Sequence, residues 1–573
     1  MDEITPNSAC RNRLFHAVAI PLFVGLLASL APRFADAQSP DYDVLIRGGH
    51  VIDGTGSPAR EADVGIRNAT IAAVGDLSAA AADRTIDASG LVVAPGFIDV
   101  HTHVAYALTD SAKRLNEAFL RQGVTTVVGG PDGAFSPGMI RLLLPSYKKH
   151  GIGTNIAFYV GHNGVRLIAM GEVGRPLTVE KVQRASKREE SEIYRRSPTD
   201  EEMEQMKALV QEGMEMGAVG LSTGLMYPPG MFATTEEVAT LARATEPYGG
   251  IYDTHVRDPV RKWLASHQEA INIGEKAGVP VKFAHLKAVG KHNTSKVDSL
   301  IRMVEAARKR GVQVVSDQYP YDAAGQTRLK DLILVKKNPA QNEKLLADRD
   351  TLATLLSSSE RRRRIKKQSE QGIDGGFSWI KAVGYQSLRI TRSSDYPELV
   401  GKYLSEIAED RGTDPFDLVA DLYVKAEAPV DVKGGVEEET VRKLLRQPWN
   451  MVASDGRHAD STTNAHPRST GTFPRVLGHY VRDLGVLSLE EAIRKMTSFP
   501  ADFLGLSDRG RLQEGAVADI VVFDPETVDA RSTYERPNAY ATGVRHVLVN
   551  GVPALLEGEL TGQAPGRFIR QQR

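Results

Sequence analysis

Eight short apolar runs separated by helical patterns constrain the fold of this chain more than any other feature. The runs lie at 97–101, 124–129, 155–161, 218–224, 251–256, 281–286, 312–319 and 451–455. Helical patterns fill most of the gaps, and the helix predicted at 200–216 begins with a capping box formed by Thr199 and Glu202. Eight alternations of strand and helix predict an α/β protein with a (β/α)8 barrel of the TIM type, whose active site lies at the carboxyl ends of the strands.

Two β-rich segments flank the barrel. Their strand patterns lie at 44–46, 64–66 and 71–74 before it and at 518–523 and 544–549 after it. We expect one small β-sandwich domain built from both chain ends, rather than two separate domains. The predicted organisation is a composite β-domain at 38–94 and 505–573 with a barrel at 95–504.

The seventh gap is too long for a single crossover helix. Roughly 130 residues separate Tyr321 from Met451, far more than a connection between a strand and the next strand needs. We expect a subdomain inserted between strands seven and eight, at 322–447, that could cover the barrel mouth. Its basic run at 361–367 is more typical of a solvated helix face than of a binding patch.

The amino-terminal segment has the features of a secretory signal peptide at 1–37. Two arginines precede the apolar stretch at 14–30, and Ala35-Asp36-Ala37 matches a small-x-small cleavage site. An uncleaved membrane anchor is the alternative, but the stretch is short for a membrane span. Either alternative places the catalytic part outside the cytoplasm, and an exported protein would be periplasmic or secreted.

Composition limits the partners and the metal ligands. The net charge is −1, with no basic excess that would favour a nucleic acid or an anionic membrane surface. We therefore expect a small-molecule substrate, no nucleic acid, and no membrane partner after removal of the signal peptide. The only cysteine, Cys10, lies in that predicted peptide. The mature chain would have neither disulfides nor thiolate ligands, so nitrogen and oxygen atoms would have to bind any metal.

Side chains that could bind such a metal follow the predicted strands. His101 and His103 end the first strand one residue apart, and the period of two puts both imidazoles on one side. The others are Asp132 after strand two, His162 after strand three, His255 and His285 at the ends of strands five and six, and Asp455 at the end of strand eight. Any one of them could be a structural histidine or a capping aspartate. Together they predict a mono- or binuclear metal site.

Several motifs resemble known families. The runs 94–103 (APGFIDVHTH) and 453–456 (ASDG) resemble the amidohydrolase superfamily. Six further runs are similar to the N-acyl-D-amino-acid deacylases, or D-aminoacylases, and they lie at 220–230, 254–258, 284–287, 319–321, 466–468 and 471–475. The resemblance covers nearly all of the predicted mature chain, from about Tyr42 onward, and is specific for the family but not for one substrate.

The resemblance implies roles for the metal ligands. His255 and His285 would bind the tighter metal, whereas His101 and His103 would belong to a second site that could be weakly occupied. Asp455 would be both a ligand and the general base, which takes a proton from the activated water and passes it to the leaving amine. The implied cofactor is one or two divalent ions, with zinc first among them.

The resemblance also implies how the substrate is held. Lys287, Tyr319 and Arg468 would bind a free carboxylate of the substrate, because cations and a phenol suit that group. Arg257 would either assist them or stabilise the strand end through an ion pair. His162 would either polarise the scissile carbonyl or pack behind the ligands.

One loop departs from the family pattern. Family members have a cysteine ligand in a Gly-Asn-Cys-Gly loop after strand two, whereas this chain has Gly130-Pro131-Asp132-Gly133. Strand four, at 218–224, offers no lysine for the carbamate bridge of other amidohydrolases. Asp132 is therefore the candidate ligand and could bridge two metals, and its harder oxygen makes manganese, cobalt or iron alternatives to zinc. Alternatively, Asp132 only forms the turn that Pro-Asp-Gly favours.

These features predict a metal-dependent hydrolase of N-acyl-D-amino acids, or of related D-configured amides, that releases a free D-amino acid and a carboxylate. A D-residue dipeptidase, a cyclic-amide hydrolase and a lactonase are alternatives on the same scaffold. A site for a free carboxylate fits deacylation or dipeptide cleavage better than ring opening. A non-catalytic barrel is the remaining alternative, motivated by the missing cysteine. The presence of Asp455 and of all four histidines that would bind metal argues against it.

Overall fold

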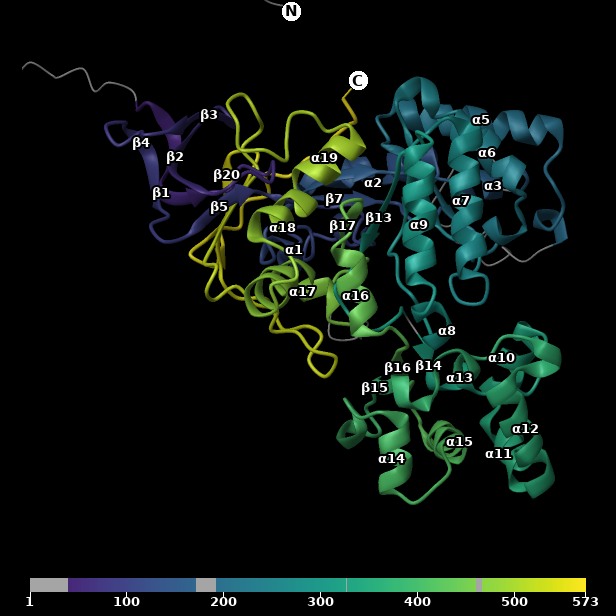
Figure 1. Cartoon of the computed structure of the whole chain (residues 1–573). Helices are drawn as coiled ribbons and strands as arrows, with labels where there is room; N and C mark the ends of the chain where they lie inside the picture. Colours follow the sequence, from purple (N-terminus) through teal and green to yellow (C-terminus); the bar gives the residue numbers. More distant parts are fainter. Residues whose placement is uncertain (1–39, 172–191, 326, 460–465, 573) are drawn as a thin grey trace, which may run out of the picture. The chain divides into compact units, whose positions relative to one another are not determined.

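Figure 1 shows a computed structural model of the chain, which describes residues 40–171, 192–325, 327–459 and 466–572. The predicted signal peptide at 1–37 lies outside the described residues. In the part of the chain that the structure describes, no helix combines the length with the apolar composition that a membrane span requires.

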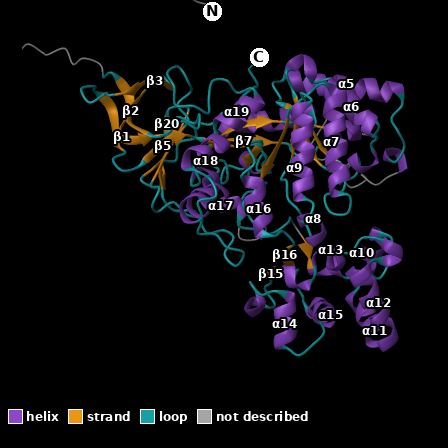
Figure 2. Ribbon diagram, in the orientation of Figure 1, coloured by secondary structure: helices purple, strands orange, loops and turns teal. Residues whose placement is uncertain are grey.

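Parallel strands in chain order form the barrel (Figure 2). One set of paired strands consists of β6 (Phe97–Asp99), β7 (Val124–Gly129) and β8 (Asn155–Phe158). The other consists of β9 (Val160–Gly161), β10 (Gly220–Gly224), β11 (Ile251–His255), β12 (Val281–Phe283), β13 (Val314–Gln318) and β17 (Asn450–Val452). β8 and β9 are two parts of the third strand, and a parallel bridge between Thr102 and Gly456 joins the first strand to the eighth. The predicted (β/α)8 barrel is confirmed.

Helices alternate with these strands and pack against them. They are α1 (Glu117–Leu120), α2 (Pro137–His150), α3 (His162–Ala169), α5 (Asp200–Glu215), α6 (Thr235–Arg243), α7 (Trp263–Ala277), α8 (Lys291–Thr294), α9 (Val297–Lys309), α16 (Glu438–Leu445), α17 (Arg468–Arg475), α18 (Leu489–Met496) and α19 (Ser498–Leu504). The capping box predicted for α5 is confirmed. The hydroxyl of Thr199 accepts the N–H of Glu202 at 3.2 Å, and the Glu202 carboxylate accepts the N–H of Thr199 at 2.8 Å. These two bonds satisfy donors that the first helical turn leaves unpaired.

Strands from both chain ends form one nine-stranded sheet, which is the predicted composite β-domain. The strands are β1 (Tyr42–Val51), β2 (Arg60–Arg67), β3 (Thr70–Gly75), β4 (Ala82–Asp87), β5 (Val92–Pro95), β18 (Ile520–Phe523), β19 (Val544–Val549), β20 (Val552–Leu556) and β21 (Glu559–Leu560). Their order is β21-β20-β19-β18-β5-β1-β2-β3, with β4 paired to β1. The antiparallel pairing of β5 with β18 places Val93 opposite Val522 and so joins the two ends of the chain.

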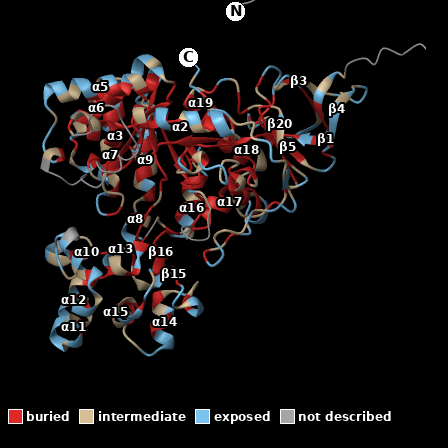
Figure 3. Ribbon diagram, turned by 180° about the vertical axis from the view of Figure 1, so that it is seen from behind, coloured by how far each residue is buried: buried red, intermediate tan, exposed pale blue. Residues whose placement is uncertain are grey.

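An insertion separates β13 from β17, as predicted. It contains β14 (Thr327–Arg328), α10 (Pro339–Ala347), α11 (Arg349–Ser357), α12 (Ser359–Gln371), α13 (Trp379–Val383), β15 (Leu388–Arg392), α14 (Leu404–Asp410), α15 (Pro415–Lys425) and β16 (Asp431–Gly434). Its three strands form a sheet in the order β14-β16-β15. The basic run lies on α12, whose surface is largely exposed in Figure 3, and Arg362 pairs there with Asp417 of α15.

Several barrel strands end before the apolar runs that predicted them. β6 ends at Asp99 although its run continues to His101, and β12 ends at Phe283 although its run continues to residue 286. The backbone leaves the strand ladder at these points. Most polar residues of the candidate site therefore lie on the turns that follow the strands, and His255 is the last residue of β11, at the end of the barrel where such sites occur.

Candidate metal centre

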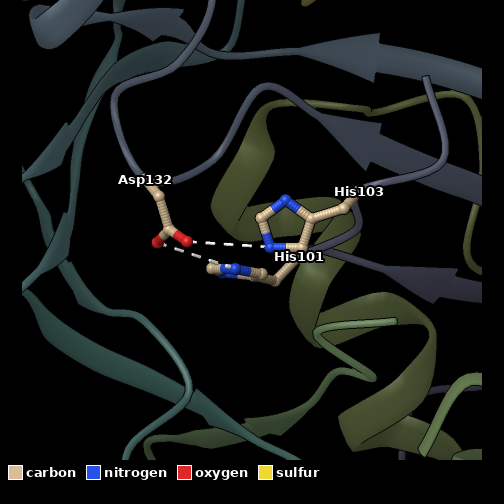
Figure 4. Close-up of side chains that lie close together, drawn as sticks. All are labelled: His101, His103 and Asp132. Carbon is tan, nitrogen blue, oxygen red and sulfur yellow. Dashed lines mark ion pairs between the residues drawn. The ribbon is translucent and has the colours of Figure 1, made fainter. Parts of the chain in front are cut away.

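Six imidazole and carboxylate side chains, the candidate ligands, meet at the carboxyl ends of the barrel strands. They are His101 and His103 after β6, Asp132 after β7, His255 at the end of β11, His285 after β12 and Asp455 after β17. Figure 4 shows that the rings of His101 and His103 both face Asp132. The structure thus brings together residues that are up to about 350 positions apart in the sequence, as the barrel topology implies.

Asp132 lies between the two pairs of histidines. Its Oδ1 is 3.5 Å from Nδ1 of His255 and 3.5 Å from Nε2 of His285. The same oxygen is 3.8 Å from Nε2 of His101, and Oδ2 is 3.6 Å from Nε2 of His103. One carboxylate therefore faces all four imidazoles, which is the position required of a ligand that bridges two metal ions.

Asp455 faces the same ring nitrogens of His101 and His103 that face Asp132. Its Oδ1 lies 3.1 Å from Nε2 of His103 and 3.7 Å from Nε2 of His101. Its Oδ2 accepts a hydrogen bond from the guanidinium of Arg468. Burial by itself would raise the pKa of Asp455, but the charge of Arg468 and the hydrogen bond with His103 hold that pKa well below its usual range. The carboxylate is therefore ionised at neutral pH.

The donor atoms of this cluster fit a divalent metal. Both ring nitrogens of His101, Oδ1 of Asp132 and Nε2 of His255 are buried and make no hydrogen bond with the described residues. Buried polar atoms are normally satisfied, so such a convergence of lone pairs calls for a ligand. Burial lowers the pKa of His101 and of His285 to about 3, which leaves both rings neutral and able to coordinate. The set of imidazole nitrogen and carboxylate oxygen suits zinc and its neighbours.

Three of the candidate ligands have a left-handed backbone. The φ angles are 58° at Asp132, 38° at His285 and 48° at Asp455. Residues other than glycine adopt this conformation at a cost, and it clusters at functional sites where the surrounding structure holds it. Ser222 provides part of that support, because its hydroxyl accepts the N–H of Gly133 at 3.2 Å and so anchors the loop of Asp132.

A buried ion-pair network lies beneath the ligands, and the sequence analysis assigned no role to it. Lys282 pairs with Asp253 at 2.8 Å and also with Asp317. The second oxygen of Asp253 accepts the hydroxyl of Ser222 at 2.6 Å, and Asp317 accepts the N–H of His285 at 2.6 Å. The network therefore connects Ser222, which anchors the loop of Asp132, with Asp317, which holds the backbone of His285. Charged residues inside otherwise apolar strands were the signal that could have found it, because such residues are rarely buried without a function or a partner.

The residues expected to bind a carboxylate, Lys287, Tyr319 and Arg468, lie together beside Asp455. The ammonium of Lys287 is 5.0 Å from the centre of the Tyr319 ring, and the guanidinium of Arg468 is 4.8 Å from the same centre. Lys287 also donates to Nδ1 of His285 at 3.1 Å, and the other ring nitrogen, Nε2, faces Asp132. Burial lowers the pKa of Lys287 to about 8. We call these three residues the carboxylate-binding group.

His162 and Arg257 have other partners. Nε2 of His162 lies 3.0 Å from the carboxylate of Glu237, and Nδ1 lies 3.4 Å from the amide oxygen of Asn163. Arg257 donates to the carboxylate of Glu269 from Nε at 3.0 Å and from Nη2 at 2.9 Å. Among the described residues, no hydrogen bond or ion pair connects His162 or Arg257 to a candidate ligand.

Tyr227 is a further neighbour of the cluster that the sequence analysis did not single out. Its hydroxyl lies 3.5 Å from Nδ1 of His255, and the two rings meet edge to face with centres 4.8 Å apart. The residue lies in the run 220–230 that resembles the deacylases, and this was the only signal for it. Its side chain is 41% exposed, so it forms part of the accessible wall beside the metal ligands.

Comparison with known proteins places this geometry in context. A family model described as "Amidohydrolase family" matches residues 189–554. The chain is similar to a D-aminoacylase of Alcaligenes xylosoxydans xylosoxydans, with 36% identity over 557 residues that cover 93% of this chain and 99% of that protein.

Two solved structures are similar over nearly the whole chain. A D-aminoacylase with a binuclear metal centre has 35% sequence identity and a TM-score of 0.67, and the match covers 92% of this chain and 99% of that one. An N-acyl-D-glutamate deacylase from Bordetella bronchiseptica, in complex with zinc and a phosphonate that mimics the tetrahedral intermediate, has 31% identity and a TM-score of 0.69 with the same coverage.

Proposed function

Since the chain belongs to the amidohydrolase family and, within it, to the N-acyl-D-amino-acid deacylases, we propose that it hydrolyses the amide bond of N-acyl-D-amino acids with a divalent metal. The products are a free D-amino acid and the carboxylate of the acyl group. The observation that carries the proposal is the position of Asp455. One of its oxygens faces His101 and His103, and the other is held by Arg468 of the carboxylate-binding group. In an N-acyl amino acid only the α-carbon separates the amide nitrogen from the free carboxylate, and Asp455 likewise lies between the histidines and Arg468.

The metal would be held by the candidate ligands. His255, His285 and Asp132 would form one site, and His101, His103 and Asp132 the other, since each set of three has donor atoms within 4.8 Å of one another. A divalent ion supplies Lewis acidity, which polarises a carbonyl and lowers the pKa of water toward about 7. We propose zinc, because the ligand set has four imidazoles, with manganese, cobalt or iron as the ions that an oxygen bridge would also accept.

Asp455 would move the proton. Its ionised Oδ1 accepts a proton from the attacking water and returns it to the nitrogen of the leaving amine, so that water is divided between the two products. Arg468 holds Oδ2, which orients the carboxylate and keeps its pKa low. A side chain held in this way needs no reorganisation during the reaction.

The carboxylate-binding group would orient the substrate. Lys287 and Arg468 lie around the ring of Tyr319, and two cations with a phenol suit a carboxylate. Fixing the α-carboxylate positions the scissile carbonyl over the metal ligands, and correct orientation contributes much of an enzyme's rate. The contacts of His162 with Glu237 and of Arg257 with Glu269 favour the structural alternatives for both residues, packing for His162 and a stabilising ion pair for Arg257.

A substrate panel combined with metal exchange tests the proposal. The purified protein is treated with a chelator, reloaded with zinc, manganese or cobalt, and assayed with N-acetyl-D-amino acids, their L-forms, D-residue dipeptides, hydantoins and lactones. We expect the metal-free protein to be inactive, and a reloaded protein to favour the N-acetyl-D-amino acids. A preference for dipeptides, hydantoins or lactones would replace this proposal with one of the other reactions that the scaffold supports. Turnover in the thoroughly metal-free protein would contradict it.

We also propose that the enzyme is exported. The support is the basic, apolar and small-residue pattern at 1–37, which is typical of a signal peptide. Expression of the full chain in a Gram-negative host, followed by mass spectrometry of the periplasmic fraction, should find a chain that begins at Gln38. A full-length chain retained in the membrane fraction would instead indicate an anchor.

A further inference from the structure

Lys433 is a buried lysine of the insertion that none of the roles above explains. It lies on β16, the central strand of the small sheet, and only 1% of its surface is exposed. Its ammonium has no hydrogen-bond partner among the described residues. A buried charge without a partner is costly, so its presence in a well-packed strand points to a ligand that completes it.

The strand of Lys433 lies against the loop that follows Tyr319 of the carboxylate-binding group. The N–H of Ala324 donates to the carbonyl of Gly434 at 3.0 Å, and Ala323 forms a β-bridge with Gly435. His466 packs on the same loop, with Nε2 at 3.4 Å from the carbonyl of Ala323 and its ring 5.6 Å from that of Tyr319. The strand of Lys433 is therefore joined to the loop that follows Tyr319, although it comes from the insertion.

The acidic residues around Lys433 are already engaged. Asp431, on the same strand, is held by Nε and Nη2 of Arg392 at 2.8 and 2.7 Å. Asp322 pairs with Arg389 at 2.5 Å, and Asp331 accepts the N–H of Arg328 at 2.8 Å. Within the described ranges no carboxylate lies within ion-pair distance of the Lys433 ammonium.

We infer that Lys433 binds a second carboxylate of the substrate, the side-chain carboxylate of an acidic N-acyl-D-amino acid such as N-acyl-D-glutamate or N-acyl-D-aspartate. The inference rests on the proposed function and names its substrate class. The side chain of the amino acid is the favoured source of this carboxylate, because the strand of Lys433 is bonded to the loop that follows Tyr319, a member of the carboxylate-binding group.

The protonation of Lys433 agrees with this role. Burial lowers its pKa to about 8, and the positive charges of Arg468 and Arg392 act in the same direction. The side chain is thus still mainly an ammonium at neutral pH. An anion bound beside it would raise the pKa again and so would be bound most tightly below pH 8.

The test compares two substrates of the same shape. We expect the wild-type enzyme to hydrolyse N-acetyl-D-glutamate with a kcat/KM at least about tenfold above that for N-acetyl-D-glutamine. In Lys433→Met, which keeps the length and loses the charge, this ratio should fall by about 10- to 100-fold, and Lys433→Arg should retain part of it. N-succinyl-D-glutamine is the third substrate. It carries its second carboxylate on the acyl group and so tests that source of the charge.

Lys495→Met is the matched control. Lys495 is equally buried, but its ammonium donates to the carbonyls of Asn450, at 2.9 Å, and of Gln447. Its replacement removes the same charge from a core position and should leave the ratio between the two substrates unchanged. If the ratio of kcat/KM for N-acetyl-D-glutamate to that for N-acetyl-D-glutamine fell similarly in both variants, the cause would be general destabilisation, and the inference would be overturned.

The remaining outcomes separate this inference from the proposed function. If the wild type hydrolyses no N-acyl-D-amino acid, the proposed function fails. If it hydrolyses N-acetyl-D-glutamine as fast as N-acetyl-D-glutamate, or if Lys433→Met affects only the succinyl substrate, this inference alone fails. Should Lys433→Met not fold, inhibition of the wild type by D-glutamate against D-glutamine gives the same comparison, and equal inhibition would overturn the inference.

Discussion

The N–H of Ser454 donates a hydrogen bond to Oδ1 of Asp99 at 3.1 Å, which ties the eighth barrel strand to the first directly beside the candidate ligands. The same oxygen accepts the N–H of His101 at 3.2 Å. Asp99 is fully buried, and Asp455 follows Ser454. One carboxylate therefore holds the backbone of a candidate metal ligand, His101, and of the residue before Asp455, the proposed general base.

Replacing Asp99 should weaken metal binding without removing a ligand. In Asp99→Ala both N–H groups lose their acceptor, so His101 and Asp455 are no longer held in register. Loss of such a supporting contact typically lowers metal affinity by about 10- to 100-fold. Titration of the metal-free variant with zinc measures the change. Asp99→Asn is the control, because its amide oxygen still accepts both hydrogen bonds. Equal losses of zinc affinity in the two variants would assign the effect to the charge of Asp99 rather than to its hydrogen bonds.

Asp132 should determine how many metal ions are retained. In Asp132→Asn the left-handed backbone remains accessible, because asparagine tolerates it, but the bridging charge is lost. We expect lower metal content after dialysis and a fall in kcat/KM of at least about 100-fold, consistent with loss of a metal ligand. Metal analysis by mass spectrometry gives the stoichiometry.

Asp132→Cys provides the complementary test. A thiolate is a softer ligand than a carboxylate, so this variant should shift metal preference toward zinc and away from manganese. Unchanged metal content and unchanged preference in both variants would leave Asp132 with the role of a turn former.

Asp455→Asn should stop turnover while the protein still binds metal. Loss of a general base typically lowers kcat by about 100- to 10,000-fold. His255, His285 and Asp132 are untouched, so the more firmly bound ion should remain. Steady-state kinetics and metal analysis on one preparation test both parts. A rate close to that of the wild type would remove Asp455 from the reaction.

Glu237 should contribute pH-dependent stability. Burial alone would raise its pKa, but the hydrogen bond from His162 and the charge of Arg166 hold the pKa below the ordinary value of 4.5. Because the folded pKa is the lower one, this stabilisation is complete above pH 4.5 and is lost as the pH falls through the folded pKa. Glu237→Gln should therefore lower the free energy of unfolding at pH 7 by about 1.5–3 kcal/mol, the range for a hydrogen bond to a charged group.

Denaturant unfolding at pH 7 and at pH 4 checks this prediction, with a smaller difference from the wild type expected at the lower pH. Glu236→Gln is a matched control, since Glu236 is the exposed neighbour and, among the described residues, forms an ion pair with Lys276 at the surface. Exposed ion pairs contribute little, so this control should remain close to the wild type at both values of pH. If the difference in free energy of unfolding between Glu237→Gln and the wild type were larger at pH 4 than at pH 7, the assigned pKa shift would be contradicted.

The local pattern of the sequence was enough to predict the barrel and most of the residues around its mouth. Apolar runs mark strands that are buried on both faces, and their ends mark one rim of a parallel barrel, so His101, His255 and Asp455 could be expected at the same place. The pairing of the two chain ends also followed from strand patterns, and the antiparallel contact of β5 with β18 realises it.

Contacts between separate elements could be found only in the tertiary structure. The sequence left Asp132 open between a bridge and a turn, because a Pro-Asp-Gly loop is compatible with both, and only the packed strands bring its two oxygens to four imidazoles. Lys433 belongs to an insertion whose connection to the site cannot be inferred from spacing along the chain. Periodicity states which face of an element is buried, whereas the side chains that meet there depend on how distant elements pack.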